Sequence, residues 1–280
     1  MTSKHLIDAH VHVWTSDVTT YPLAADYCVP RDQPISFTSE VFLAITRPLG
    51  VERTVLIQSD FYGFDNSYLL DTIQRFPGVF AGVAQIDEFG ADPVAELRCL
   101  KSLGIRGVRI VPPKRGDSKW LDGPGMQALW LCGAAEQLAI CPLIDADDLT
   151  TVTRMCRRFP ETTVVVDHAA NIGSDGQFRE ADLKSLCDLA QFPLTHAKLS
   201  GFYFLGQKRP PYIELAPMIR RLLDAFGPER LMWGSDCPFQ LQPPNSYPAS
   251  LGLVRDRLDF VSSGDKEWLL HRTAAKVFFS

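Results

Sequence analysis

The 280-residue sequence lacks the features that mark several large classes of protein. Its seven cysteines are odd in number and include no C-x-x-C pair, which argues against a disulfide framework and suits buried thiols in a reducing compartment. No apolar run approaches the roughly 18 residues of a membrane span, and no charged and then apolar leader opens the chain. There is no basic tract to hold a phosphate backbone, and the formal net charge is −5. We therefore expect a cytoplasmic protein that binds neither nucleic acid nor membrane.

What is present is the pattern of a globular α/β protein. The chain is 46% hydrophobic and 22% charged, and short apolar runs alternate with longer amphipathic ones. The short runs predict strands at 6–13, 53–58, 79–86, 105–110, 139–144, 163–167, 196–200 and 230–234. The longer runs predict helices at 39–50, 66–75, 93–103, 125–137, 149–159, 180–190, 212–226 and 266–278. Eight strands that are each followed by a helix predict a single (β/α)8 TIM barrel over residues 1–280. An open doubly wound sheet is the alternative, but its usual glycine-rich turn after the first strand is absent.

Two segments are longer than the short connections that a strand–helix repeat requires. Residues 16–37 form a long loop after the first strand, and the proline-rich residues 240–248, with Tyr247, follow the last strand. Long ordered loops tend to be functional. Because both leave the carboxyl ends of strands, we expect extended loops over the C-terminal mouth of the barrel.

The mouth is also where the catalytic residues of such barrels lie. His10 and His12 are two residues apart on the first strand, which directs both imidazoles to one face. Barrel closure would bring Asp236, after the eighth strand, beside them. The other polar residues at predicted strand ends are Gln58 to Asp60, Asp87, Arg109, Asp145, Asp167, His168, Lys198 and Ser200.

Several segments, taken in order, resemble the amidohydrolase superfamily, and within it the lactonase branch with 2-pyrone-4,6-dicarboxylate lactonase and sugar lactonases. They are Asp8-Ala-His-Val-His, Asp65-Asn-Ser with Leu69-Leu-Asp, Gly107-Val-Arg, Val166-Asp-His, Lys198-Leu-Ser-Gly-Phe-Tyr and Leu231-Met-Trp-Gly-Ser-Asp-Cys-Pro. The resemblance covers nearly the whole chain. It implies a hydrolase that opens a lactone with His10, His12, His168 and Asp236 around the reacting carbonyl.

The resemblance leaves the metal open. Two-metal members of the superfamily usually carry a bridging lysine or glutamate after strand four and a histidine after strand five, and this chain has neither. His10, His12, His168 and Asp236 could still bind one zinc ion, because three imidazoles and a carboxylate satisfy its tetrahedral preference. The lactonase branch includes members that work without a metal, so we favour hydrolysis that requires no cofactor.

The substrate side departs from the dicarboxylate lactonases. Asn171 and Phe204 stand where those enzymes would be expected to have arginines, the residues suited to binding carboxylates. We therefore expect a neutral or singly anionic lactone. Its contacts are predicted to come from Arg109, Asn171, Lys198 and Tyr203, with Lys114, Arg115, Lys208 or Arg209 reaching in from loops.

Roles follow from the chemistry of ester hydrolysis, which needs a base, a group that polarises the carbonyl and an acid for the leaving oxygen. Asp236 is the predicted base, provided that its enclosure raises its pKa, and the imidazoles with Arg109 would stabilise the oxyanion. Lys198, in mid-strand, has a buried ion pair as its alternative role, and for Cys237 packing is favoured over nucleophilic catalysis. Alternatives for the whole protein are a zinc-dependent nonoxidative decarboxylase, another mononuclear-metal amidohydrolase, or an inactive ligand-binding barrel. The sequence leaves a monomer or a homodimer open.

Overall fold

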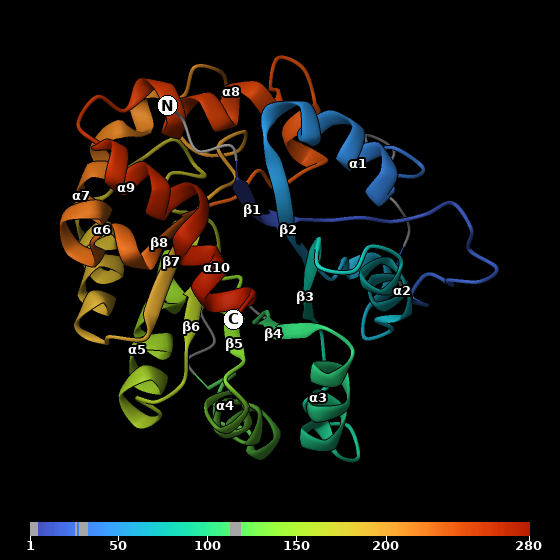
Figure 1. Ribbon diagram of the computed structural model, residues 1–280. Helices are drawn as coiled ribbons and strands as arrows, with labels where there is room; N and C mark the ends of the chain where they lie inside the picture. Colours follow the sequence, from blue (N-terminus) through green and yellow to red (C-terminus); the bar gives the residue numbers. More distant parts are fainter. Residues whose placement is uncertain (1–4, 26, 28–32, 113–118) are drawn as a thin grey trace.

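The computed structural model describes residues 5–25, 27, 33–112 and 119–280, and shows a nearly closed barrel of eight parallel strands. The strands follow one another in chain order around the ring, and most of the helices lie outside it (Figure 1). They are β1 Leu6–Val11, β2 Val51–Ile57, β3 Phe80–Ala84, β4 Ile105–Ile110, β5 Ala139–Pro142, β6 Val164–Val166, β7 Thr195–Leu199 and β8 Leu231–Trp233. The predicted TIM barrel is confirmed, and the ends of its strands differ from the predicted ones by no more than about two residues.

Closure between β8 and β1 is made just beyond the last strand. The amide of His12 donates to the carbonyl of Cys237 at 2.8 Å, and the amide of Asp236 donates to the carbonyl of His10 at 2.8 Å. Gly234 permits this approach, because a Cβ there would lie 2.7 Å from the Cβ of His10. The seam of the barrel therefore sets Asp236 against the two histidines of β1.

The helices are segments of 5 to 13 residues. They are α1 Ser39–Thr46, α2 Ser67–Arg75, α3 Pro93–Ser102, α4 Pro124–Glu136, α5 Leu149–Arg158, α6 Glu180–Asp188, α7 Ala216–Phe226, α8 Tyr247–Gly252, α9 Ser263–Glu267 and α10 Thr273–Phe278. Local sequence sets several starts: the Asp92 side chain accepts from the Ala95 amide at 2.9 Å, and Pro93 follows at the first helical position. Within the described ranges, no helix is both long enough and apolar enough to cross a membrane.

Two helix predictions were wrong in detail. Residues 266–278 were predicted as one helix, but the segment starts at Ser263 and is divided by a π-helix, Trp268–Arg272, between α9 and α10. α8 was missed, because Pro243, Pro244 and Pro248 make its start look like a loop. Pro248 lies in the first turn of α8, where the missing N–H costs no hydrogen bond, and the Ser246 side chain caps the helix.

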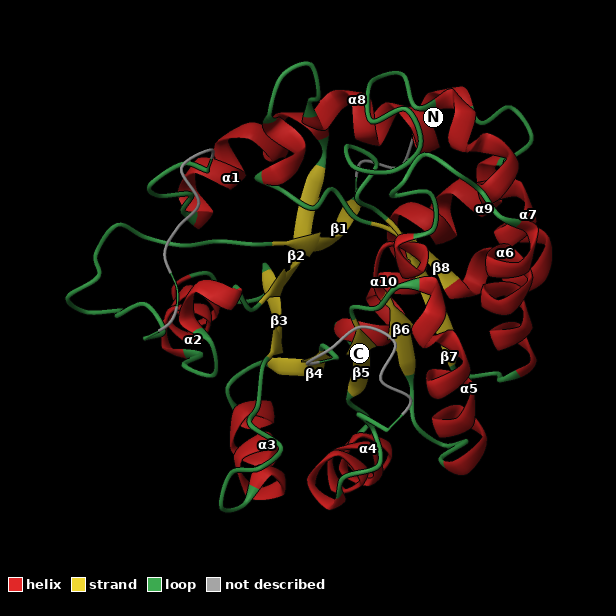
Figure 2. Ribbon diagram, turned by 180° about the vertical axis from the view of Figure 1, so that it is seen from behind, coloured by secondary structure: helices red, strands yellow, loops and turns green. Residues whose placement is uncertain are grey.

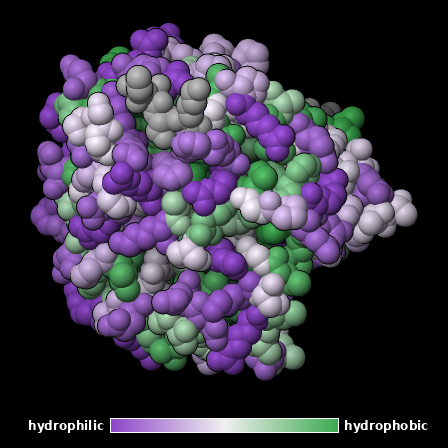
Figure 3. All heavy atoms as spheres, in the orientation of Figure 1, coloured by the Kyte–Doolittle hydropathy of each residue, from purple (hydrophilic) through white to green (hydrophobic). Residues whose placement is uncertain are grey.

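The core has two layers. Small and branched side chains fill the inside of the barrel, and Phe278 of α10 packs among them from below; the set includes Ile7, Ala9, Val55, Ile57, Ala81, Val83, Ala139, Cys141, Val165 and Met232. Figure 1 shows α10 and the C-terminus across the centre of the ring. A larger apolar layer lies between strands and helices. Figure 3 shows hydrophilic residues over most of the same face, with hydrophobic ones scattered among them.

Candidate active site

A cavity of about 390 Å³ opens at the carboxyl ends of the strands. Figure 2 shows the loops that surround this end of the barrel. Residues that follow most of the strands contribute to its wall, which is the position expected for the active site of a TIM barrel. The described residues that line it are His12, Tyr27, Gln33, Ser59, Asp60, Phe61, Arg109, Leu143, His168, Asn171, Tyr203, Phe204, Asp236 and Phe239.

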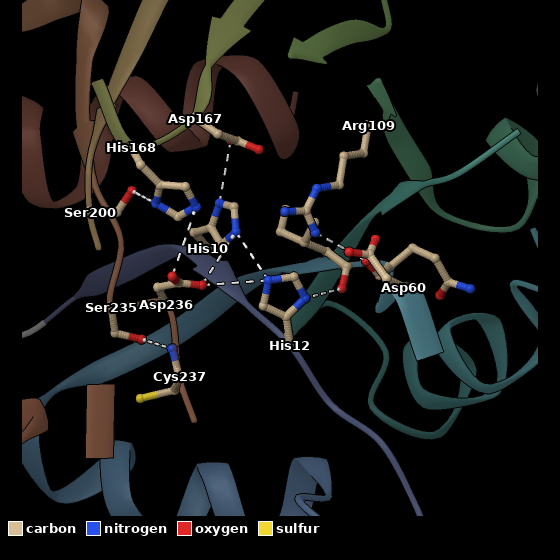
Figure 4. Close-up of polar contacts among 12 residues, drawn as sticks. His10, His12, Asp60, Arg109, Asp167, His168, Ser200, Ser235, Asp236 and Cys237 are labelled. Carbon is tan, nitrogen blue, oxygen red and sulfur yellow. Dashed lines mark hydrogen bonds and ion pairs between the residues drawn. The ribbon is translucent and has the colours of Figure 1, made fainter. Parts of the chain in front are cut away.

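Asp236 is the centre of the site, and three imidazoles surround it (Figure 4). Its Oδ1 lies 3.6 Å from Nε2 of His10 and 3.5 Å from Nε2 of His12, and its Oδ2 lies 3.8 Å from Nε2 of His168. All four residues are nearly inaccessible to solvent. Oδ1 has no hydrogen-bond partner although it is buried, which is costly unless something else binds there. The convergence predicted from the sequence is therefore present, with one acceptor open.

The Nδ1 atoms of His12 and His168 form hydrogen bonds with groups outside the cluster around Asp236. Nδ1 of His12 lies 3.0 Å from the carbonyl oxygen of Ile57, so that nitrogen carries the proton and Nε2 keeps a lone pair. Nδ1 of His168 lies 2.9 Å from the hydroxyl of Ser200. The Tyr203 hydroxyl donates to Oδ2 of Asp236 at 2.9 Å. These contacts fix ring orientation and tautomer, as outer hydrogen bonds do in metal sites.

A buried ion pair lies behind His10. Nζ of Lys198 is 2.9 Å from Oδ1 of Asp167 and 3.1 Å from Nδ1 of His10, and both charged side chains are fully buried. The β1–β2 register shifts between Asp8 and Val11. This shift lets Ala9 pack inside the barrel while His10 also reaches Lys198 inside it.

Asp8 braces the first strand against the last. Oδ1 accepts from the amides of Ser235 at 2.8 Å and His10 at 3.2 Å, and Oδ2 accepts from the Tyr247 hydroxyl at 2.9 Å. Burial raises the pKa of Asp8 to about 6, although these hydrogen bonds oppose the shift. Tyr247 was expected above the mouth, but it is fully buried in the layer between strands and helices and contacts Asp8 from there.

The turns that present the site are conformationally strained. His168 to Asn171 have positive φ values of 49 to 56°, and Asp236 has a φ of 63°. Non-glycine residues in this region are disfavoured by about 1–2 kcal/mol each, and such strain often marks functional sites. Gly201 is required beside them: a Cβ there would lie 2.3 Å from the Phe204 ring and 3.1 Å from Nδ1 of His168.

The electrostatics differ from the prediction made for Asp236. Burial alone would raise its pKa, but the electrostatic attraction of the neighbouring imidazoles, His168 first and then His12 and His10, outweighs burial and lowers it. Burial, followed by the charge of Lys198, holds the pKa of His10 well below its ordinary value. Burial likewise lowers the pKa of His168. The expected upward shift of the Asp236 pKa was therefore wrong, because the surrounding imidazoles favour the carboxylate more than burial disfavours it.

The same residues can be tested as ligands for zinc. One atom each from His10, His12 and Asp236 lie within 4.8 Å of one another, and the two Nε2 atoms are 3.3 Å apart. That spacing fits two nitrogens bound about 2.0–2.1 Å from a tetrahedral ion. The open Oδ1 of Asp236 and the lone pair on His12 also fit. Geometry therefore allows one zinc held by His10, His12 and Asp236, while His168, whose ring lies 4.4 Å from that of His10, is not part of this ligand group.

Three of the four predicted substrate contacts lie on the cavity wall. Arg109 donates to the carbonyl of Gln58 at 3.4 Å and its buried Nε has no partner. Asn171 donates to Asp145 at 2.7 Å, and Tyr203 contacts Asp236. Lys198 does not lie on the wall: its side chain is fully buried and is paired with Asp167, as in the alternative role predicted for it.

The loop predictions have mixed outcomes. Tyr27 and Gln33 of the first loop line the cavity, as expected. Lys208 and Arg209 do not line it, and Lys114 and Arg115 lie outside the described residues. Cys237 is fully buried, and burial raises the pKa of its thiol well above the ordinary value, which supports packing over nucleophilic catalysis.

From the sequence, Phe204 was named at a substrate-side position, but Phe61 and Phe239 of the aromatic wall were missed. Phe61, Phe204 and Phe239 line the cavity, and the Phe239 ring lies 5.6 Å from that of His12, edge to face. Asp60 was noted at a strand end but given no role. The available signal was position, because each of these residues follows a strand by a few positions.

A (β/α)8 barrel with imidazoles and a carboxylate at its mouth is the architecture of an amidohydrolase-type enzyme. A sequence model of the family described as Amidohydrolase matches residues 7–279, and the chain belongs to that family.

Relatives and solved structures extend this result. The chain is 32% identical over 236 residues to L-fucono-1,5-lactonase from Burkholderia ambifaria, covering 83% of this chain and 80% of the relative. It is 27% identical over 247 residues to the 2-pyrone-4,6-dicarboxylate hydrolase of Comamonas testosteroni, covering 83% and 76%. An amidohydrolase from Burkholderia multivorans, solved with bound zinc, superimposes with a TM-score of 0.81 at 22% identity, covering 98% of this chain and 99% of that one. At that identity the structure supports the fold alone.

Proposed function

We propose that this enzyme hydrolyses the cyclic ester of a neutral, hydroxylated lactone, with Asp236 as the group that moves the proton. The observation that carries the proposal is the buried, unpartnered Oδ1 of Asp236 among three imidazoles at the mouth of the barrel. The relatives support the reaction class, because the two named above act on lactone rings.

The wall of the cavity supports a substrate of low negative charge. Among the described lining residues, Arg109 is the one arginine or lysine, and Asp60 and Asp236 add two carboxylates. Asn171 and Phe204 occupy the two positions where arginine would suit a dicarboxylate. The polar Ser59, Gln33 and Asn171 can hydrogen-bond ring hydroxyls, while the phenylalanines cover an apolar face. A sugar lactone, the substrate class of the 32% identical relative, fits this wall.

In the proposed reaction, water attacks the carbonyl carbon as Asp236 takes one of its protons. A carboxylate of lowered pKa is ionised at neutral pH but is a weak base, so the carbonyl must be strongly polarised by Arg109 and by an N–H of the histidine cluster. The tetrahedral intermediate then collapses with cleavage of the ring C–O bond. The proton on Asp236 passes to the leaving oxygen, and the low pKa that makes Asp236 a weak base makes it a good acid here.

We propose that this reaction proceeds without a metal. A zinc ion held by His10, His12 and Asp236 would supply Lewis-acid polarisation and a more acidic water. The roles of Arg109, Tyr203 and Asp236 in binding and proton transfer do not require it.

The test is a lactone panel assayed by proton release, with and without chelator, on protein whose metal content has been measured. L-fucono-1,5-lactone should be opened with a higher kcat/KM than 2-pyrone-4,6-dicarboxylate, and chelation should leave the rate unchanged. Failure to open any lactone, or a preference for the dicarboxylate, would contradict the proposed substrate class. One zinc per chain together with activity lost to chelator would contradict the metal-free reaction, and release of carbon dioxide would favour a decarboxylase.

A matched pair of variants sharpens the substrate assignment. Replacing Asn171 and Phe204 together by arginine should raise the relative activity on the dicarboxylate by about tenfold or more, because each Arg–carboxylate pair is a strong, directional contact. Replacing them by glutamine and leucine is the control and should leave that ratio unchanged.

A further inference from the structure

The residue that the proposed reaction leaves unexplained is Lys198. Its side chain is fully buried in the barrel, where a lysine is rare unless it is paired. Asp167 supplies the countercharge at 2.9 Å, so the pair could be purely structural. Yet Nζ also reaches Nδ1 of His10 at 3.1 Å, within hydrogen-bond distance of a ring that faces the cavity cluster.

An ammonium group has donors and no acceptor, so Nδ1 of His10 must accept from Lys198. A neutral imidazole that accepts at Nδ1 carries its proton on Nε2. Nε2 of His10 lies 3.3 Å from Nε2 of His12, which is itself an acceptor because its Nδ1 donates to the carbonyl of Ile57. Every contact along this chain then has one donor and one acceptor, from Lys198 through both rings to the backbone.

In the alternative tautomer, Nδ1 of His10 carries the proton and donates a hydrogen bond to Asp167. Oδ1 of Asp167 is 3.4 Å from that nitrogen, which is longer than the 3.1 Å contact from Lys198. It would also place two lone pairs face to face, on the Nε2 atoms of His10 and His12, at 3.3 Å. Without a cation between them, that arrangement is repulsive.

We propose that Lys198 is a positioning residue that holds His10 as the Nε2–H tautomer. In the unliganded site, the Nε2–H of His10 and the lone pair of His12 therefore face each other at 3.3 Å. Figure 4 shows His10 between Asp167 on one side and Asp236 with His12 on the other. That the Nε2–H of His10 stabilises the oxyanion rests on the proposed function; the tautomer itself does not.

The same contact bears on zinc. A metal requires a lone pair on Nε2 of His10, so that ring must first move its proton to Nδ1 and turn its hydrogen bond from Lys198 to Asp167. Lys198 therefore opposes ligation by His10, even though the spacing of the ligand atoms fits the ion.

The direct test is nitrogen NMR of the metal-free, full-length protein labelled with 15N-histidine, with ring signals assigned from His10→Gln and His12→Gln variants. Couplings to the ring carbon protons identify which nitrogen is protonated. We expect the proton of His10 on Nε2 and that of His12 on Nδ1. A proton on Nδ1 of His10 would overturn the proposal. The measurement needs no turnover, so an inactive lactone panel would sink the proposed function and leave this result standing.

A double variant tests whether Lys198 is what holds the proton of His10 on Nε2. Lys198→Met with Asp167→Asn removes the hydrogen bond and both charges together, which avoids leaving a buried carboxylate alone. The proton of His10 should no longer be held on Nε2, and the affinity for added zinc, measured by competition with a chelating dye, should rise about tenfold or more. Lys184→Met with Asp188→Asn, an exposed pair on α6, is the matched control and should change neither. A folded double variant with an unchanged His10 tautomer and unchanged zinc affinity would contradict the role of Lys198; if it does not fold, the wild-type spectrum decides.

Discussion

His10 and His196 are both buried histidines on barrel strands, yet only one of them lies in a site. His10 is near the mouth and contacts Lys198, Asp167, His12 and Asp236. His196 is near the opposite end and lines a larger cavity, of about 810 Å³, with its Nδ1 3.1 Å from the carbonyl of Leu194. Neither the burial of these histidines nor the volume of the nearby cavity distinguishes the mouth of the barrel from its opposite end. The difference is that a buried carboxylate with an unpartnered oxygen lies among three imidazoles at the mouth, and the following predictions test that distinction.

The largest effect is expected from Asp236→Asn. An amide cannot take up the proton from water, so kcat/KM should fall by about a thousandfold or more, which corresponds to roughly 4 kcal/mol. Circular dichroism should show an unchanged fold, and steady-state assays measure the loss.

Asp122→Asn is the control for that change, since Asp122 pairs with Arg154 on the surface. It should keep full activity. Undiminished turnover in Asp236→Asn would show that this carboxylate takes no part in the reaction. The mouth and the opposite end of the barrel would then no longer differ by a catalytic carboxylate.

His196 should affect stability and not catalysis. Burial lowers its pKa to about 4, from 6.5, so below pH 6.5 the unfolded chain binds the proton that the folded chain excludes. The stability that the neutral His196 contributes to the folded protein is therefore fully present above pH 6.5. It is lost as the pH falls toward about 4, the pKa of His196 in the folded chain. Between pH 7 and pH 5 the loss is about 2 kcal/mol.

Urea unfolding of the wild type and of His196→Gln at both pH values measures this. The stability difference between the two proteins should move by about 2 kcal/mol in favour of the variant as the pH falls, while kcat/KM stays equal. A difference that is independent of pH would show that His196 takes up its proton equally easily in the folded chain.

Arg109→Lys should lower kcat/KM by about a hundredfold, mainly through kcat, because one directed donor to the developing oxyanion is lost. Arg106→Lys is the control at the other end of the same strand, where Arg106 binds the carbonyl of Lys101. Equal effects of the two changes would argue that Arg109 supports only the barrel.

The sequence specified this barrel well because its signals are local. Short apolar runs that alternate with longer amphipathic ones predict the eight repeats, and position after a strand predicts which polar residues reach the mouth. The three histidines and Asp236 come from three places in the chain, and only closure of the ring unites them.

What the sequence could not supply depends on contacts between distant residues. Lys198 looked like a substrate contact because strand order says nothing about depth inside the barrel. The pKa of Asp236 shifts downward because the imidazoles win over burial, and that balance depends on separations of a few tenths of an ångström. Tyr247 acts through Asp8, more than two hundred residues away in the chain.

Tyr203→Phe is expected to give the smallest effect and the finest test of the mouth. The phenol donates to Oδ2 of Asp236 and stabilises its charged form, so removing the hydroxyl should raise the pKa of Asp236 and move the acid limb of kcat/KM by about one pH unit upward. At neutral pH the stronger base partly offsets the lost contact, and the decrease should stay near tenfold. Tyr21→Phe, which removes the same kind of bond to Asp71 on the surface, should leave both quantities unchanged. An acid limb that does not move would mean that some other group than Asp236 limits the reaction at low pH.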